Sequence, residues 1–155
     1  MNIDVYKMLA YDEGIRLNAY RDTMGILTVG IGHNLESDPA GEILKRHLNV
    51  GDKITEIECQ KLFNRDKIHV YHDLDENIKD WSKYAVKYQF ILVNMCFNMG
   101  INRLLKWANT ISAMRRDDHE AVIAGIMNSR YAKQVPNRAK RLCELAKGNI
   151  PHEYS

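Results

Sequence analysis

The sequence lacks any apolar run that approaches the roughly 20 residues needed for a membrane-spanning helix. Its first residues, MNIDVYKML, include an early aspartate and lack the basic start and apolar core of a signal peptide. No internal repeat or low-complexity segment is present. These absences favour one modest domain synthesised in the cytoplasm, and 155 residues are enough to bury a core of its own.

Cysteine is also scarce. The chain has only Cys59, Cys96 and Cys143, an odd number at wide spacing. A disulfide framework usually needs an even number of cysteines in a short chain. The sequence therefore predicts reduced thiols.

Charge of either sign is present, but it is unevenly distributed. Residues 1–78 hold 9 Lys and Arg against 14 Asp and Glu, a net charge of −5, whereas residues 79–155 hold 13 against 6, a net charge of +7. A basic second half could steer the protein towards an anionic polymer, such as bacterial cell wall or nucleic acid. No helix-turn-helix and no aromatic strand platform favours the second of these.

The stretch from Glu13 to His33, EGIRLNAYRDTMGILTVGIGH, begins at a predicted helix end. Apolar residues at near-helical spacing predict a helix over residues 3–12, with Asp4 as its N-cap. Gly14 supplies the left-handed residue that commonly ends a helix. A carboxylate at that end faces the negative pole of the helix dipole, which favours its protonated form. A protonated carboxyl is what a general acid requires.

The residues that follow have the pattern of a β-hairpin. Asp22 and Gly25 occupy the first and fourth positions of a predicted type I turn, and residues 26–33 are predicted to form a strand. Strand alternation places Thr28 on one face with two glycines, which leaves that face open to a bulky ligand such as a sugar ring. Turn formation alone would also account for Asp22.

Most of the remaining sequence has helical periodicity. Thr55 and Glu58 have the spacing of a capping box, and the helical pattern after them continues to residue 78, a length that predicts a connection between two lobes. Residues 84–99, which Ser82 could cap, are apolar almost all round, as in a helix at the centre of a core. Short helices are expected within residues 34–52, with Pro39 in the first turn, and over residues 102–106, 110–116, 119–129 and 137–146.

Two groups of acidic residues and histidines could in principle bind a cation. His69 and His72, with Asp66 and Asp73 nearby, could place metal ligands on one helix face, although exposed polar residues on a connecting helix account for them equally well. The run that starts at Asp73 begins like an EF-hand loop but lacks the glycine and glutamate that such a loop requires. The sequence therefore predicts no metal and no other cofactor.

The combined pattern resembles a known family. Glu13, Asp22 and Thr28, separated by eight and five residues and followed by VGIGH, are arranged as in the phage-type lysozymes, glycoside hydrolase family 24. The resemblance continues, in one order and at matching spacing, through three further segments. These are ITEIECQKLFNRD (residues 54–66), LVNMCFNMG (92–100) and SRYAKQVPNRAKR (129–141).

The resemblance implies an α+β fold of one lysozyme domain over residues 1–155. A small lobe over residues 13–56 is expected to hold a β-hairpin or a three-stranded antiparallel sheet. A connecting helix over residues 57–78 is expected to lead to a mostly helical lobe formed by residues 1–12 and 79–155. The active cleft is expected between the lobes.

The chemistry implied by the resemblance is hydrolysis of the β-1,4 bond between N-acetylmuramic acid and N-acetylglucosamine in peptidoglycan. Glu13 is expected to protonate the leaving oxygen, and Asp22 and Thr28 to hold and activate water. Glu13 ends a helix and Asp22 lies in a turn beyond a strand, so nothing forces the two carboxyls together. That spacing, like the resemblance, favours an inverting reaction.

Supporting roles also follow from the resemblance. His33, on the inward face of its strand, is expected to pair with Asp66, and Arg138 is expected to pair with the catalytic glutamate and to favour its charged form. Asn34, Gly125 and Tyr131 depart from the family's residues, which affects substrate fit. Substrate contacts are expected at Gly32, Asn34, Phe97, Thr110 and Gly125.

The expected partner is the glycan strand of peptidoglycan, bound by a monomer that neither binds nucleic acid nor inserts into a membrane. The enzyme is expected to be made in the host cytoplasm and to reach the wall in the periplasm after holin-type release, which causes host cell lysis. Two alternatives stay open: a basic nucleic-acid-binding protein, and a cell-wall-binding module that kept the fold but lost catalysis. Retention of Glu13, Asp22 and Thr28 argues against the second.

Overall fold

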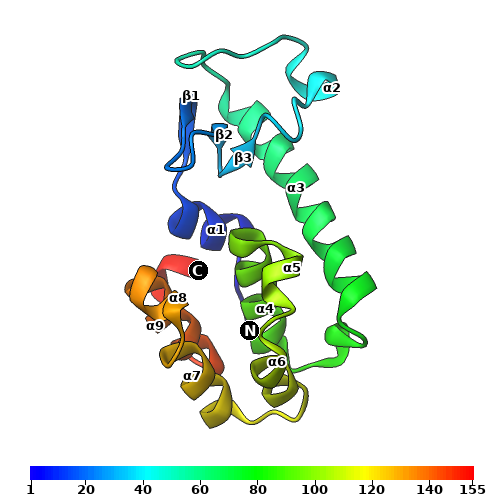
Figure 1. The fold of residues 1–155 in the computed structure, drawn as a ribbon, viewed down its shortest axis with the longest axis vertical. Coiled ribbons are helices and arrows are strands. Elements are labelled where there is room, and N and C mark those ends of the chain that lie inside the picture. Colours follow the sequence, from blue (N-terminus) through cyan, green and yellow to red (C-terminus); the bar gives the residue numbers. More distant parts are fainter. The chain divides into compact units, whose positions relative to one another are not determined.

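A computed structural model describes residues 1–155, which form nine α-helices, two short 3-10 helices and one three-stranded sheet (Figure 1). The predicted α+β class with a small antiparallel sheet is confirmed. None of the helices combines the length and the apolar character needed to cross a membrane. The chain divides into two compact units, residues 9–69 and residues 1–8 together with 70–155.

Helix α1 (Val5–Glu13) is capped at both ends by the predicted residues. The Asp4 carboxylate accepts the backbone N–H of Lys7 at 3.2 Å, as an N-cap does. Gly14 follows the last helical residue with φ of +79°, a conformation that favours glycine. Glu13 is therefore the C-terminal residue of this helix, as predicted.

The sheet consists of three antiparallel strands in chain order: β1 (Arg16–Arg21), β2 (Leu27–Gly30) and β3 (His33–Asn34). The predicted turn closes the hairpin, since the Gly25 N–H donates to the Asp22 carbonyl at 2.9 Å. The strand predicted over residues 26–33 is wrong in its length. Gly30 and Gly32 have φ of +69° and +64°, so the chain turns there and β3 pairs back onto β2.

Helix α3 (Glu56–Asn77) begins with the predicted capping box. The Thr55 N–H donates to Glu58 Oε1 at 2.9 Å, and the Glu58 N–H donates to Thr55 Oγ1 at 3.1 Å. The short helix before it, α2 (Gly41–Leu44), covers a single turn and starts after Pro39, so the prediction that Pro39 lies within its first turn is wrong.

Helix α4 (Val86–Met99) supplies seven buried residues to the other unit, as its apolar sequence predicts. Ser82 does not cap it, because the chain first forms a 3-10 helix, η1 (Trp81–Lys83), and Ala85 occupies the N-cap position. In Figure 1, α4 is drawn in green, and its contacts include α5 and α9.

The remaining helices follow the predicted periodicity, with bounds that differ from the predicted ones by at most two residues at either end and with two additions, over residues 130–134 and 152–154. Helix α8 was not predicted, and it begins where the Ser129 hydroxyl accepts the N–H of Ala132 at 3.3 Å. These helices are α5 (Ile101–Leu104), α6 (Ala108–Arg115), α7 (His119–Met127), α8 (Arg130–Gln134), α9 (Pro136–Ala146) and the 3-10 helix η2 (His152–Tyr154).

Candidate active site

Asp22 stands at the end of β1, where the hairpin turn fixes its side chain. Its Oδ1 accepts the backbone N–H groups of Met24 at 2.8 Å and Ile26 at 2.9 Å. Its other carboxylate oxygen makes no hydrogen bond with the protein. Asp22 therefore does form the predicted turn, which alone would account for an aspartate here. The turn engages only one of its two carboxylate oxygens. One oxygen anchors the carboxylate, and the other can accept a hydrogen bond from a further group.

Thr28 lies on β2, directly opposite Tyr20 of β1 in the sheet register. Its side chain is 5% exposed, and its hydroxyl donates to the Ile26 carbonyl at 2.8 Å. Because the single hydroxyl proton is used in that bond, Thr28 can only accept a hydrogen bond from a further group. A water molecule beside Thr28 would therefore point one of its hydrogens at Oγ1.

The two glycines near Thr28 have different surroundings. A Cβ at Gly30 would lie 3.3 Å from Cys59 Sγ, so this buried glycine faces the interior of its unit and the predicted open face does not extend there. Gly32 is exposed, and a Cβ at this position would lie 3.8 Å from Glu13 Oε2. The absence of a side chain at Gly32 leaves room beside the predicted general acid.

Tyr20 and Arg16 belong to the same region, although neither was among the predicted site residues. The Arg16 guanidinium lies over the Tyr20 ring at 3.7 Å from its centroid. Burial raises the pKa of Tyr20, Arg16 opposes that rise, and the charges of Asp22 and Glu13 add to it. Both predicted catalytic carboxyls therefore act electrostatically on the Tyr20 hydroxyl. Two-residue alternation back from Asp22 along the strand would have identified Tyr20.

His33 is held at both ring nitrogens. Nδ1 lies 2.7 Å from Asp66 Oδ2, which is the predicted pair, and Nε2 lies 2.7 Å from the Asp38 carbonyl oxygen. Neither partner can donate a hydrogen, so the arrangement is fully satisfied only by the doubly protonated ring. Burial lowers the pKa of His33, but the bonds to Asp66 and Asp38 outweigh burial and raise it above 6.5.

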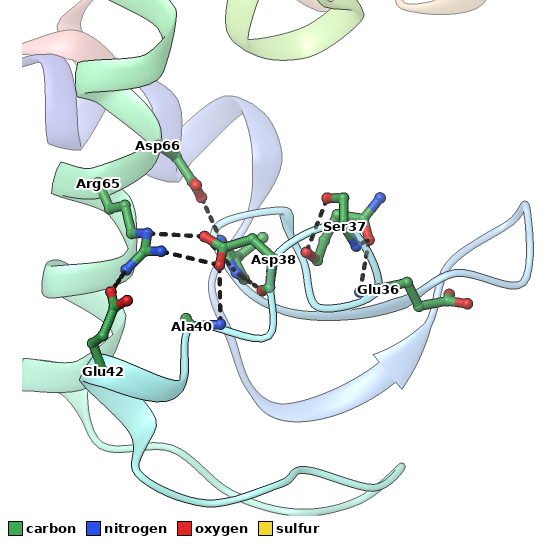
Figure 2. A network of polar contacts seen from close by, with 9 residues as sticks. Glu36, Ser37, Asp38, Ala40, Glu42, Arg65 and Asp66 are labelled. Carbon is green, nitrogen blue, oxygen red and sulfur yellow. Dashed lines mark hydrogen bonds and ion pairs between the residues drawn. The ribbon is translucent and has the colours of Figure 1, made fainter.

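A chain of ion pairs extends this contact along α3 (Figure 2). Arg65 Nε lies 3.0 Å from Asp38 Oδ2, and Arg65 NH1 lies 2.6 Å from Glu42 Oε2. Asp38 Oδ1 also accepts the N–H of Ala40 at 3.0 Å. Arg65 thus joins the loop after β3 to the helix that also carries Asp66.

Ligand atoms of His33, Asp38 and Asp66 lie within 4.8 Å of one another, as a metal site would require. Both nitrogens of His33 are already hydrogen-bonded, and Arg65 supplies a cation to Asp38. A metal ligand must be a neutral imidazole with one free lone pair. The chemistry of this cluster therefore suits an ion-pair network, not a metal centre.

Asn34, a predicted substrate contact, shapes the loop after β3. Its Oδ1 accepts the N–H groups of Glu36 at 2.9 Å and Ser37 at 3.0 Å, which forms an Asx turn (Figure 2). Its side-chain NH2 group makes no hydrogen bond with the protein. The Asn34 side chain therefore uses its acceptor for the backbone and keeps its two donor hydrogens unused within the protein.

Phe97, Thr110, Gly125 and Arg138 lie in the unit formed by residues 1–8 and 70–155, so their placement beside Glu13 stays a prediction. Thr110 is buried, and a Cβ at Gly125 would collide with Thr110 Oγ1. The two positions are coupled, because glycine at 125 leaves the space that Thr110 fills. Phe97 is half-buried near the end of α4.

Arg138 is 5% exposed on α9, and an asparagine of α4 orients it. Its Nε donates to Asn94 Oδ1 at 2.9 Å, and its NH2 donates to the Asn94 carbonyl at 3.3 Å. Asn94 is fully buried, and it was not among the predicted site residues because it lies within a mostly apolar helix. An amide flanked by apolar residues on both sides was the available signal, because buried polar groups need partners.

A cavity of about 510 Å³ opens in the same unit. Its lining includes the cations Arg103, Lys106 and Arg130 and no carboxylate. The rings of Trp107 and Tyr131 meet edge to face there, with centroids 5.8 Å apart. This composition suits an anionic or polar ligand with an apolar portion.

The sequence of residues 10–143 matches the family model described as phage lysozyme. The chain belongs to this family. The resemblance drawn from the sequence is therefore confirmed, and so is the enzyme class, a glycoside hydrolase.

Among proteins similar in sequence, the pre-baseplate central spike protein Gp5 of Enterobacteria phage T4 is 31% identical, over 91% of the chain but only 27% of that protein. The probable T4-type lysozyme 2 of Dictyostelium discoideum is 27% identical over 95% of both chains. The peptidoglycan hydrolase gp36 of Pseudomonas phage phiKMV is 31% identical over 86% of the chain and 14% of its own length. The chain thus matches whole lysozymes and also one part of much longer phage proteins.

Proposed function

We propose that this phage lysozyme hydrolyses the β-1,4 bond between N-acetylmuramic acid and N-acetylglucosamine in peptidoglycan, with inversion at the anomeric carbon. Glu13 gives its proton to the leaving oxygen, Asp22 takes a proton from the attacking water, and Thr28 holds that water. Family membership supports the substrate class. The polar contacts of the hairpin support the division of roles.

The observation that carries the mechanism is which hydrogen-bonding positions of Asp22 and Thr28 are already occupied within the protein. Asp22 keeps one oxygen outside its turn, and Thr28 has donated its only proton to Ile26. Both groups can therefore accept from one water molecule, which uses both of its hydrogens and leaves a lone pair for the sugar carbon. An attack of Asp22 on the sugar itself would give Thr28 no role.

The sheet register supports room for that water. Thr28 is opposite Tyr20, and Asp22 follows Tyr20 by two residues on the same face, so Asp22 and Thr28 are diagonal neighbours across the hairpin. Diagonal neighbours in antiparallel sheets are about 7–8 Å apart at Cα. That spacing is too long for direct contact between short side chains and suits one bridging water.

The test uses Glu13→Gln, which removes the transferable proton and hardly changes the side-chain volume. We expect clearing of permeabilised Gram-negative cells to fall about 10²–10⁴-fold, the range that a general acid contributes. The matched control is Glu56→Gln, an exposed glutamate in the same unit with no side-chain hydrogen bond, which should clear at the wild-type rate. Proton NMR of the wild-type reaction should show the α-anomer first.

Each alternative gives a different result in this experiment. Near-normal clearing by Glu13→Gln would exclude Glu13 as the acid, and a β-anomer appearing first would require a covalent intermediate on Asp22. A wall-binding module without catalysis would sediment with cell walls and leave their turbidity unchanged. A nucleic-acid-binding protein would neither sediment with cell walls nor reduce their turbidity.

The proposal extends to the cellular setting of the reaction. We infer a monomer made in the host cytoplasm, which needs a holin-type pore because peptidoglycan lies outside the inner membrane. Lysis should then follow expression only when a pore-forming protein is present. Lysis by the phage lysozyme alone would exclude this route.

A further inference from the structure

A second cavity, also rich in cations, lies between the end of α3 and the last turn of α6. It measures about 390 Å³ and is lined by Lys79, Asp80, Lys83, Tyr84 and Arg115. All five residues belong to the unit of residues 1–8 and 70–155. Three of the five are cations and only one is a carboxylate. Nothing in the proposed reaction uses them.

Tyr84 is the buried polar group of this cavity, at 7% exposure. Its hydroxyl oxygen accepts the Nε–H of Arg115 at 3.2 Å, and its own proton goes to no acceptor in the protein. That bond anchors Arg115 through Nε, while its two terminal nitrogens make no hydrogen bond. A fork-shaped pair of donors is therefore held beside an unused hydroxyl proton.

The two lysines add further donors. Lys79 makes no hydrogen bond or ion pair with its side chain, and the Lys83 ammonium is 3.8 Å from Asp80 Oδ1, beyond hydrogen-bond distance. The backbone acceptors of this segment are occupied instead, because the Gln89 amide donates to the carbonyls of Ser82 at 2.9 Å and Tyr84 at 2.8 Å. The cavity therefore has a surplus of donors and of positive charge.

A partly apolar cavity of about 400 Å³ adjoins this site and shares Lys79 and Arg115 with it, and four of its eight lining residues are apolar. Its lining includes Ile78, Leu105 and Ile111, of which Leu105 is 38% exposed. One pair of cations thus stands at the junction between a donor-rich hollow and a partly apolar one. A free inorganic ion would use only the first, whereas an anion attached to an apolar chain would use both.

We propose that this pair of cavities, which we call the Lys83–Arg115 site, binds the phosphate group of an anionic lipid. Arginine, lysine and tyrosine donors suit the oxygens of a phosphate, and the partly apolar cavity takes the adjoining part of the lipid. The net charge of +7 over residues 79–155 draws the same part of the chain towards an anionic membrane surface. The site would hold the lysozyme at the membrane surface.

The test is binding of the whole chain to vesicles made of equal parts phosphatidylglycerol and phosphatidylcholine, compared with phosphatidylcholine alone. Wild-type protein should bind the anionic vesicles and not the neutral ones. The double variant Lys83→Gln with Arg115→Gln should lose about 25-fold in vesicle affinity, from about fivefold for each cation near the surface. Tyr84→Phe, which keeps every charge, should lose about tenfold because a donor to phosphate is gone.

A matched control distinguishes a specific binding site from general electrostatic attraction to the vesicle. Lys133→Gln with Lys140→Gln removes the same charge from exposed positions outside both cavities and should cost far less affinity. Equal losses in the two double variants, or equal binding of wild type to both vesicles, would overturn the proposal. Titration with inorganic phosphate, followed by NMR, tests whether the bound phosphate belongs to a lipid or is a free ion. Chemical-shift changes at Arg115 in the absence of any vesicle binding would reject the lipid. Melting curves would confirm that Tyr84→Phe and both double variants are folded.

Discussion

At the scale of single residues, the surroundings of His33 determine how the stability of the fold depends on pH. The ring donates to Asp66 on one side and to the Asp38 carbonyl on the other, and its pKa is raised above 6.5. A raised pKa in the folded state means that folding favours the charged ring. The stabilisation is therefore complete below about pH 6.5 and is lost as the pH rises through the folded value.

Asp66→Asn tests this pair, because it removes the negative charge and keeps the side-chain volume. At about pH 5.5 we expect a loss of about 2 kcal/mol, or roughly 4–8 °C in melting temperature, as for a hydrogen bond to a charged group. As the pH rises towards about 9 the His33 ring loses its proton, and the loss should become smaller. Thermal melts at both pH values measure the difference, and an equal loss at both would exclude the charged pair.

The residue types at the candidate site were easier to predict than whether each side chain donates or accepts a hydrogen bond there. The pattern of Glu13, Asp22 and Thr28 was visible in the sequence, whereas the commitment of Thr28's proton to Ile26 depends on one rotamer. Asn94 shows the same limit. Its amide matters because Arg138, 44 positions later, packs against it, and no local pattern contains that contact.

At the scale of elements, the start of α3 combines a cap with an ion pair. Arg46 binds Glu58 through two hydrogen bonds, at 2.7 Å and 3.1 Å, and Glu58 also accepts from Thr55. The bond from Arg46 lowers the pKa of Glu58 from 4.5 to about 2, with burial opposing and Thr55 assisting. A lowered pKa contributes stability above pH 4.5, and that contribution disappears as the pH falls towards 2.

Glu58→Gln should therefore destabilise the lysozyme at neutral pH and make little difference in acid. We expect a loss of about 1 kcal/mol at pH 7, or roughly 2–4 °C, because glutamine can keep the capping hydrogen bond but loses the charge that pairs with Arg46. Glu56→Gln, in the same first turn but exposed, is the control and should change little. Melting temperatures from about pH 7 down to about pH 2 would show the two curves of wild type and Glu58→Gln converging. A constant gap would mean that the Glu58 charge contributes nothing.

Elements with their own end signals were predicted well. The capping box at Thr55 and the glycine after Glu13 act locally, so the sequence contains the whole cause. The prediction of one strand over residues 26–33 was wrong because the two-residue alternation of side chains gives no indication that Gly30 and Gly32 turn the backbone. Helix α8 was missed because five residues are too few to show a period, although the serine cap at its start was readable.

At the scale of the whole molecule, one unit is a continuous segment and the other is assembled from two segments on either side of it. Residues 1–8 belong with residues 70–155, and the unit of residues 9–69 lies between them in sequence. Helices α1 and α3 both cross the unit boundaries, at residues 8–9 and 69–70. Because a helix propagates cooperatively once formed, unwinding either helix in one unit weakens its continuation in the other. The two units should therefore unfold together.

The three cysteines can measure this coupling, since Cys59 lies in the first unit and Cys96 and Cys143 lie in the second. All three are buried and no disulfide joins them, and burial, assisted by the charge of Asp73, raises the pKa of Cys96 to about 12. The native thiols should react slowly, because only the thiolate is nucleophilic. Pulsed alkylation at increasing urea, read by mass spectrometry, should expose Cys59 and Cys96 at the same midpoint. Labelling of Cys59 at a lower urea concentration, while Cys96 stays protected, would show that residues 9–69 unfold by themselves and that the continuous helices do not couple the units.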